Sequence, residues 1–280
     1  MRMTLILAAT MALAGGLAEA GVLDRAKDTG ELRLGYRADA QPFSFTNAEG
    51  RAAGYSVELC RAVGREVAAE LSLPDLRLVE VLLTAADRLD AIPAGKADLL
   101  CEATTLTLAR RATMDFSLLT FASGATLLYP ADGATEFAQL AGKKVGVLTG
   151  STTEPGLRKA LADAKIDVEV VPVATHSDGI ERLASGEFAA YFGDGAILLY
   201  HLLQSPFRDR LKLSDKVLSF EPYALALPKG DDAFRLVADR ALARLSRTGE
   251  IAAMFQHSFG PGAKPSGLVQ ALWLLNAVPE

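Results

Sequence analysis

A cluster of hydroxyl side chains and one arginine follow a short apolar segment in the first half of the chain. Residues 97–101 are expected to form a strand; Thr104, Thr105 and Thr107 follow it, and Arg110 comes about one helical turn later. A threonine hydroxyl both donates and accepts hydrogen bonds, whereas an arginine guanidinium offers a carboxylate a planar fork of donors. The pattern predicts a site that holds an ammonium group and a carboxylate together. The alternative is a strand that leaves the core through polar loop residues.

The rest of the chain alternates between short apolar strands and helices. Expected strands lie at 32–36, 76–81, 97–101, 144–148, 168–173, 188–192, 217–220 and 223–227, and expected helices at 57–71, 88–94, 154–162, 177–185, 196–203, 232–247, 251–257 and 268–278. This alternation is typical of α/β folds with a largely parallel sheet, and it starts again near residue 144. The sequence therefore predicts two α/β lobes.

The first twenty residues are predicted to be a secretory signal peptide. Arg2 precedes an apolar run over 5–17, and Ala18-Glu19-Ala20 is a small-x-small cleavage site before Gly21. The apolar run is too short to span a membrane. No cysteine lies near the cleavage site, so we expect no lipid anchor and a periplasmic protein.

Charge and cysteine content narrow the classes of function. The net charge is −5 and the basic residues are scattered, which argues against nucleic-acid binding. The two cysteines, Cys60 and Cys101, come without clustered histidines, so neither a metal site nor a cofactor is expected. An even number of cysteines in an oxidising compartment favours a disulfide over two buried thiols.

Four polar clusters lie where expected strands end. They are Tyr36-Arg37, residues 103–107, residues 149–153 and Asp194, two from each half of the chain. Ligands of open α/β sheets bind beyond the carboxyl ends of the strands. A ligand that touches all four clusters must lie in a cleft between the lobes.

Several motifs occur in an order that resembles the periplasmic amino-acid-binding proteins of ABC importers, solute-binding protein family 3. They are T-T-x-T-x-x-R-x-x-x-x-D-F-S over 104–117, G-Y-S-V-E-L over 54–59 and T-G-E-I over 248–251. The resemblance implies the two-lobe periplasmic-binding-protein fold (type II). Lobe 1 would comprise 21–123 and 223–280, and lobe 2 would comprise 124–222.

The resemblance also implies roles for four residues that meet the amino-acid backbone. Arg110 matches the arginine that binds the α-carboxylate, and Thr152 matches a second contact to that group. Thr105 and Asp194 match the groups that bind the α-ammonium. The alternatives are a surface ion pair between Arg110 and Asp115, and helix capping by Thr152 and Asp194.

Three further residues match those that surround the ligand side chain in the glutamate/aspartate-binding branch. They are Arg37, Arg88 and His176. Alternatively, Arg37 pairs with Asp39, Arg88 pairs with Asp87 or Asp90, and His176 caps or packs.

Three positions depart from the pattern of that branch. Ala85 and Ala103 replace serines, and Glu102 replaces a glycine. An inward-facing Glu102 would oppose an acidic ligand. An acidic amino acid is nevertheless the first expectation.

The resemblance implies a monomeric binding protein that closes on an amino acid and delivers it to an ABC permease in the membrane. The expected protein is therefore not an enzyme. One alternative is a cyclohexadienyl dehydratase, for which Glu102 or Glu154 would be the general acid. Another is a sensory module that presents its ligand to a receptor.

Overall fold

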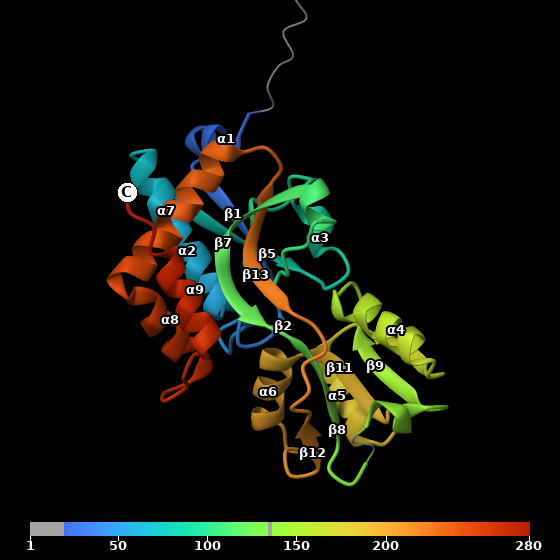
Figure 1. Ribbon diagram of the computed structural model, residues 1–280. Coiled ribbons are helices and arrows are strands. Elements are labelled where there is room, and N and C mark those ends of the chain that lie inside the picture. Colours follow the sequence, from blue (N-terminus) through green and yellow to red (C-terminus); the bar gives the residue numbers. More distant parts are fainter. Residues whose placement is uncertain (1–19, 134–135) are drawn as a thin grey trace, which may run out of the picture.

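The computed structural model describes residues 20–133 and 136–280, and it forms two α/β lobes (Figure 1). The predicted signal peptide, apart from Ala20, lies outside the described residues. Within the described part of the chain, no helix is both long and apolar enough to cross a membrane.

The first lobe is built on a five-stranded sheet that helices cover on both faces. Its strand order is β5 (Arg77–Leu83), β1 (Glu31–Arg37), β6 (Leu99–Leu100), β13 (Glu221–Pro228) and β7 (Met114–Ser123). One face packs on α1 (Val22–Thr29), α2 (Tyr55–Glu70), α7 (Asp232–Thr248), α8 (Glu250–Phe259) and α9 (Gly267–Asn276). The short α3 (Arg88–Ala91) covers the other face (Figure 1). A small sheet, β2 (Asp39–Ala40), β3 (Ser44–Thr46) and β4 (Ala52–Ala53), lies beside β1.

The second lobe repeats this architecture with fewer helices. Its strand order is β10 (Glu169–Val173), β9 (Lys144–Leu148), β11 (Ala190–Asp194), β8 (Ala125–Pro130) and β12 (Leu211–Leu213). Its helices are α4 (Thr153–Ala164), α5 (His176–Ala184), α6 (Gly195–Gln204) and the short 3₁₀ helix η2 (Phe137–Leu140). A second 3₁₀ helix, η1 (Arg110–Ala112), lies in the first lobe directly before β7.

The chain crosses between the lobes at two places that lie side by side. β7 continues into β8 through Gly124, and the return crossing leads into β13, where Glu221 pairs with Ser123. A Cβ atom on Gly124 would lie 2.4 Å from Val217 Cγ1 and 2.5 Å from Ser219 O. Only glycine therefore permits this close approach of the two crossings.

The sheets differ from the largely parallel arrangement that the sequence predicts. β13 runs antiparallel to β6 and β7, and β8 runs antiparallel to β11 and β12.

The prediction of a strand over 217–220 is wrong. Val217 and Phe220 are exposed, and Leu218 N donates a single hydrogen bond to Ala125 O. The local pattern does not reveal the antiparallel pairings, because they join residues from 63 to 126 positions apart. The lobe boundaries at 123/124 and 222/223 stay a prediction.

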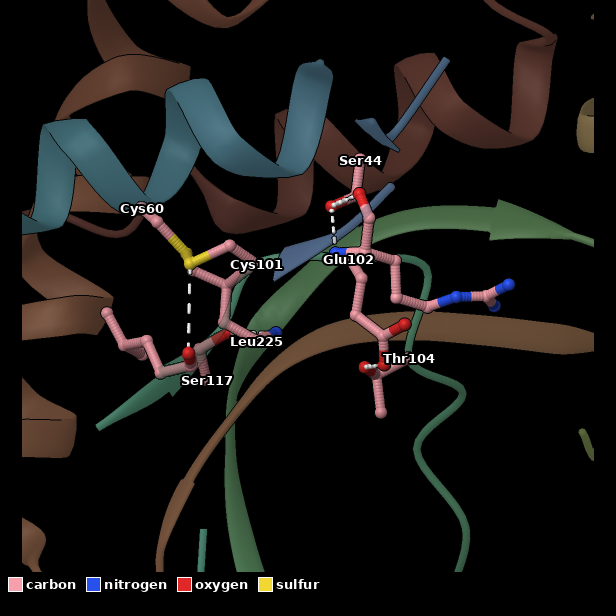
Figure 2. The surroundings of a disulfide bond; sticks show 9 residues. Ser44, Cys60, Cys101, Glu102, Thr104, Ser117 and Leu225 are labelled. Carbon is pink, nitrogen blue, oxygen red and sulfur yellow. Dashed lines mark hydrogen bonds between the residues drawn. A yellow bond between two sulfur atoms is a disulfide. The ribbon is translucent and has the colours of Figure 1, made fainter. Parts of the chain in front are cut away.

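A disulfide joins α2 to the end of β6. Cys60 Sγ bonds to Cys101 Sγ, both residues are buried, and Figure 2 shows the bond beneath α2. Cys101 directly precedes Glu102, so the crosslink also fixes the start of the polar segment that the sequence singles out.

Loss of the disulfide is expected to lower stability markedly, because it closes a loop of 41 residues. For a loop of this length, the entropy that the crosslink removes from the unfolded chain stabilises the folded state by about 3–4 kcal/mol. We expect the variant Cys60→Ala/Cys101→Ala to lose about that much free energy of unfolding in urea titrations. Reductant should lower the midpoint of the wild type and leave that of the variant unchanged. Equal wild-type midpoints with and without reductant would contradict the expectation.

Candidate functional site

A cavity between the two lobes is lined by all seven predicted ligand-binding residues. These are Arg37, Arg88, Thr105, Arg110, Thr152, His176 and Asp194. Most follow the carboxyl end of a strand: β1 ends at Arg37, β6 precedes Thr105, β9 precedes Thr152, and β11 ends at Asp194. The fold therefore brings together side chains that are up to 157 positions apart in the sequence.

The backbone of the second lobe touches the first lobe at the edge of this cavity. Gly150, which has φ +67°, lies so close to Ala85 that a Cβ atom would be 2.8 Å from Ala85 O. Arg88 Nη2 donates to Gly150 O at 3.2 Å. His176 N donates to Asp39 Oδ2 at 3.4 Å. The lobes are thus closed on one another.

Glu221 joins the two lobes and is absent from the residues predicted from the sequence. Its Oε2 accepts hydrogen bonds from Thr105 Oγ1 of the first lobe at 2.6 Å and from Thr152 Oγ1 of the second at 2.7 Å. Ser219 Oγ donates to Oε1 at 2.6 Å. Because both threonine hydrogens point at Glu221, the threonine oxygens keep lone pairs that can accept from an ammonium group. In the sequence, Glu221 is marked only by its position, two residues before the predicted strand 223–227, and this position alone does not indicate a place in the site.

Arg110 lies at the start of η1 and points back to the hydroxyl cluster. Its Nη1 donates to Thr105 O at 2.8 Å, and no ion pair to a carboxylate is found for it within the described residues. The alternative partner, Asp115, instead pairs with Lys229 at 3.0 Å. Burial, followed by the nearby charge of Arg88, lowers the pKa of Arg110 to about 10. Arg110 is therefore charged at neutral pH.

Asp194 both caps a helix and lines the cavity. Its Oδ1 accepts from Ala196 N at 2.9 Å and from Ile197 N at 3.2 Å, at the start of α6. Burial raises the pKa of its carboxyl to about 6, although the hydroxyls of Tyr223 and Ser123 oppose the rise. The capping alternative and a place in the cavity are thus both realised.

The three residues predicted to meet the ligand side chain all have protein partners. Arg37 Nη2 pairs with Asp39 Oδ1 at 2.6 Å, which is the alternative weighed above. Arg88 pairs with Glu102 at 3.0 Å, and its alternative pairing with Asp87 or Asp90 is wrong. His176 Nδ1 lies 3.1 Å from Tyr191 OH.

His176 is held in the neutral state. Burial, followed by the charge of Arg37, lowers the pKa of its imidazole well below the ordinary value. Thr175, rather than His176, caps α5 by accepting from Asp178 N at 3.1 Å. The ring of His176 is therefore available as an uncharged hydrogen-bonding group.

The two carboxylates weighed as general acids for an enzyme lie outside the cavity lining. Glu102 is buried behind it against Arg88 and Thr104, and Glu154 pairs with Arg158 on the surface of α4. In the described part of the chain, no group of three histidine, cysteine or acidic residues is arranged to hold a metal ion.

Two α/β lobes joined by two crossings, with a polar cavity between them, define a two-lobe ligand-binding protein of the periplasmic type. The chain belongs to the bacterial extracellular solute-binding proteins of family 3, whose model matches residues 32–261.

Characterised relatives of the chain are binding proteins. It is 32% identical over 250 residues to the L-glutamate/L-aspartate-binding protein of Pseudomonas aeruginosa, covering 89% of this chain and 83% of that protein. It is 29% identical over 267 residues to the glutamate/aspartate import solute-binding protein of Escherichia coli, covering 92% and 88%. The structure of an ancestral arginine-binding protein bound to glutamine matches with a TM-score of 0.73 and 27% identity, covering 82% and 98%.

Amino-acid affinity is expected to fall in acid because Asp194 takes up a proton. Its carboxyl is ionised above a pKa of about 6 and neutral below it, so its attraction for an ammonium group is lost as pH falls through 6. At pH 5 only about a tenth of such groups are ionised. We expect binding measured by isothermal titration to be about tenfold weaker at pH 5 than at pH 7.5. Asp194→Asn should bind weakly at both pH values, and a constant wild-type affinity would contradict the assignment.

Removal of the Glu221 carboxylate is expected to loosen lobe closure. Glu221→Gln weakens three hydrogen bonds to a charged acceptor, each worth about 1.5–3 kcal/mol. We expect a larger radius of gyration for the ligand-free variant in small-angle X-ray scattering. Glu154→Gln, which neutralises a surface carboxylate, is the matched control. Superimposable scattering curves for Glu221→Gln and the wild type would show that Glu221 does not hold the lobes together.

Proposed function

We propose that this protein captures a polar or acidic amino acid in the periplasm by closing its lobes, and delivers it to an ABC permease in the membrane. The ligand occupies the cavity between the lobes. The family and the characterised relatives support amino-acid capture, and the names of those relatives put glutamate and aspartate first among the ligands.

The observation that carries this proposal is the placement of opposite charges in one cavity. Arg110 offers a guanidinium that no described carboxylate neutralises, and Asp194 and Glu221 offer carboxylates nearby. An α-amino acid carries an ammonium and a carboxylate on one carbon, so its carboxylate can pair with Arg110 while its ammonium pairs with the carboxylates. Charge-assisted hydrogen bonds of this kind are the strong ones in proteins.

Lobe closure follows from the same contacts. A ligand that touches Thr105 and Arg110 in one lobe and Thr152 and Asp194 in the other makes all its contacts only when the lobes are closed. It therefore shifts the population toward the closed state by its differential affinity for that state. The permease would then recognise the closed surface.

Truncation of Arg110 should abolish amino-acid binding. Loss of a charged partner to a buried carboxylate costs about 2–5 kcal/mol or more. We expect Arg110→Ala to lose at least thirtyfold in affinity by isothermal titration, for the amino acid that stabilises the wild type most in a thermal-shift screen. Arg111→Ala removes the neighbouring exposed arginine and should bind as the wild type does. Unchanged affinity of Arg110→Ala would contradict the assignment, and no stabilisation by any amino acid would contradict the proposed function.

A further inference from the structure

Two of the three arginines that line the cavity, Arg37 and Arg88, are already ion-paired to the protein. Arg88 pairs with Glu102 at 3.0 Å, and their side chains are 4% and 1% exposed. Arg37 pairs with Asp39 through Nη2 at 2.6 Å and Nε at 3.1 Å. Each pair is formally neutral, so neither arginine offers an uncompensated charge to a ligand.

Glu102 is fixed in this role by its surroundings. Its Oε1 accepts from both Arg88 Nη1 and Thr104 Oγ1, the latter at 2.7 Å. Figure 2 shows Glu102 beside Thr104, on the segment that the disulfide anchors through Cys101. The two donors and the crosslinked backbone beside Glu102 favour its pairing with Arg88.

Arg110 is the one arginine of the cavity lining that forms no ion pair with a described carboxylate. Three arginines, Arg37, Arg88 and Arg110, face four carboxylates, and His176 is neutral because its pKa lies well below the ordinary value. The carboxylates are Asp39, Glu102, Asp194 and Glu221. Arg110 takes the α-carboxylate of the ligand, so a second carboxylate would be buried without a free cation, which is costly.

Hydrogen-bonding atoms without a partner do remain on residues that line the cavity. Arg88 Nε and His176 Nε2 are buried and have no hydrogen-bond partner within the described residues. Arg88 Nε is a donor, whereas the neutral imidazole either donates or accepts according to its tautomer. A primary amide carries an acceptor oxygen and a donor nitrogen, so it can hydrogen-bond to groups of both kinds without adding charge.

We propose that Glu102 and Asp39 set the specificity of the cleft by neutralising Arg88 and Arg37, so that it selects an amino acid with a primary amide side chain, asparagine or glutamine, over the corresponding acid. This inference rests on the proposed function and narrows it to one chemical class of ligand. It departs from the first expectation, an acidic amino acid.

The test compares asparagine, glutamine, aspartate and glutamate by isothermal titration at pH 7.5. We expect one amide to bind the wild type at least tenfold more tightly than its own acid. Glu102→Gln keeps the size of the side chain and frees the charge of Arg88, so it should shift the ratio of acid to amide affinity at least tenfold toward the acid. Glu80→Gln, which breaks the ion pair with Arg61 in the same lobe outside the cavity, should leave the ratio unchanged.

A second variant keeps the test decisive if Glu102→Gln does not fold. Asp39→Asn frees Arg37 at a position whose side chain is 20% exposed, and it should shift the ratio in the same direction. Tighter wild-type binding of aspartate or glutamate than of either amide would overturn the inference and leave the proposed function standing. If the protein bound other amino acids but none of these four, the inference would again be overturned and the proposed function would stand. If it bound no amino acid at all, the proposed function itself would be overturned.

Discussion

The Glu221 carboxylate joins the two lobes across the cleft, together with the contacts of Arg88 to Gly150 and of His176 to Asp39. It stands at the start of β13, where the chain re-enters the first lobe, and it accepts hydroxyl hydrogens from Thr105 and Thr152 on opposite sides of the cleft. A carboxylate at the hinge thereby orients both threonine oxygens toward the cavity. In the proposed function, the threonine hydroxyls that join the lobes through Glu221 are also the groups that meet the ligand.

Charge compensation distinguishes Arg110 from the other two arginines of the cavity. Arg110 has no ion pair with a described carboxylate, and it shares the cavity lining with the carboxylates of Asp194 and Glu221. Arg37 and Arg88 are instead neutralised by Asp39 and Glu102. Arginine at a position typical of an acidic-ligand site is therefore not enough to predict an acidic ligand, because the partner of the arginine decides the local charge.

Much of the fold can be predicted from the sequence because helices and parallel strands carry local hydrophobic patterns. The predicted strand at 144–148 and helix at 232–247 match β9 and α7 to within a residue. Local hydrophobic patterns do not predict the antiparallel strands β7 and β8 or the residue at which β13 begins, because the strands that pair with them lie far along the chain. The predicted strand at 217–220 fails for a different reason: its apolar residues, Val217, Leu218 and Phe220, are exposed and pair with no described strand.

The sequence by itself determined the residue types of the site, because the motif around Arg110, the polar strand ends and Asp194 are all visible in it, and all seven predicted residues line one cavity. Only the tertiary structure decided how these residues are paired. Glu102 reaches Arg88 across fourteen positions, and Glu221 reaches Thr105 across 116. Such pairings arise from the way distant elements pack against one another, so the charge that the cleft presents to a ligand is a property of the fold.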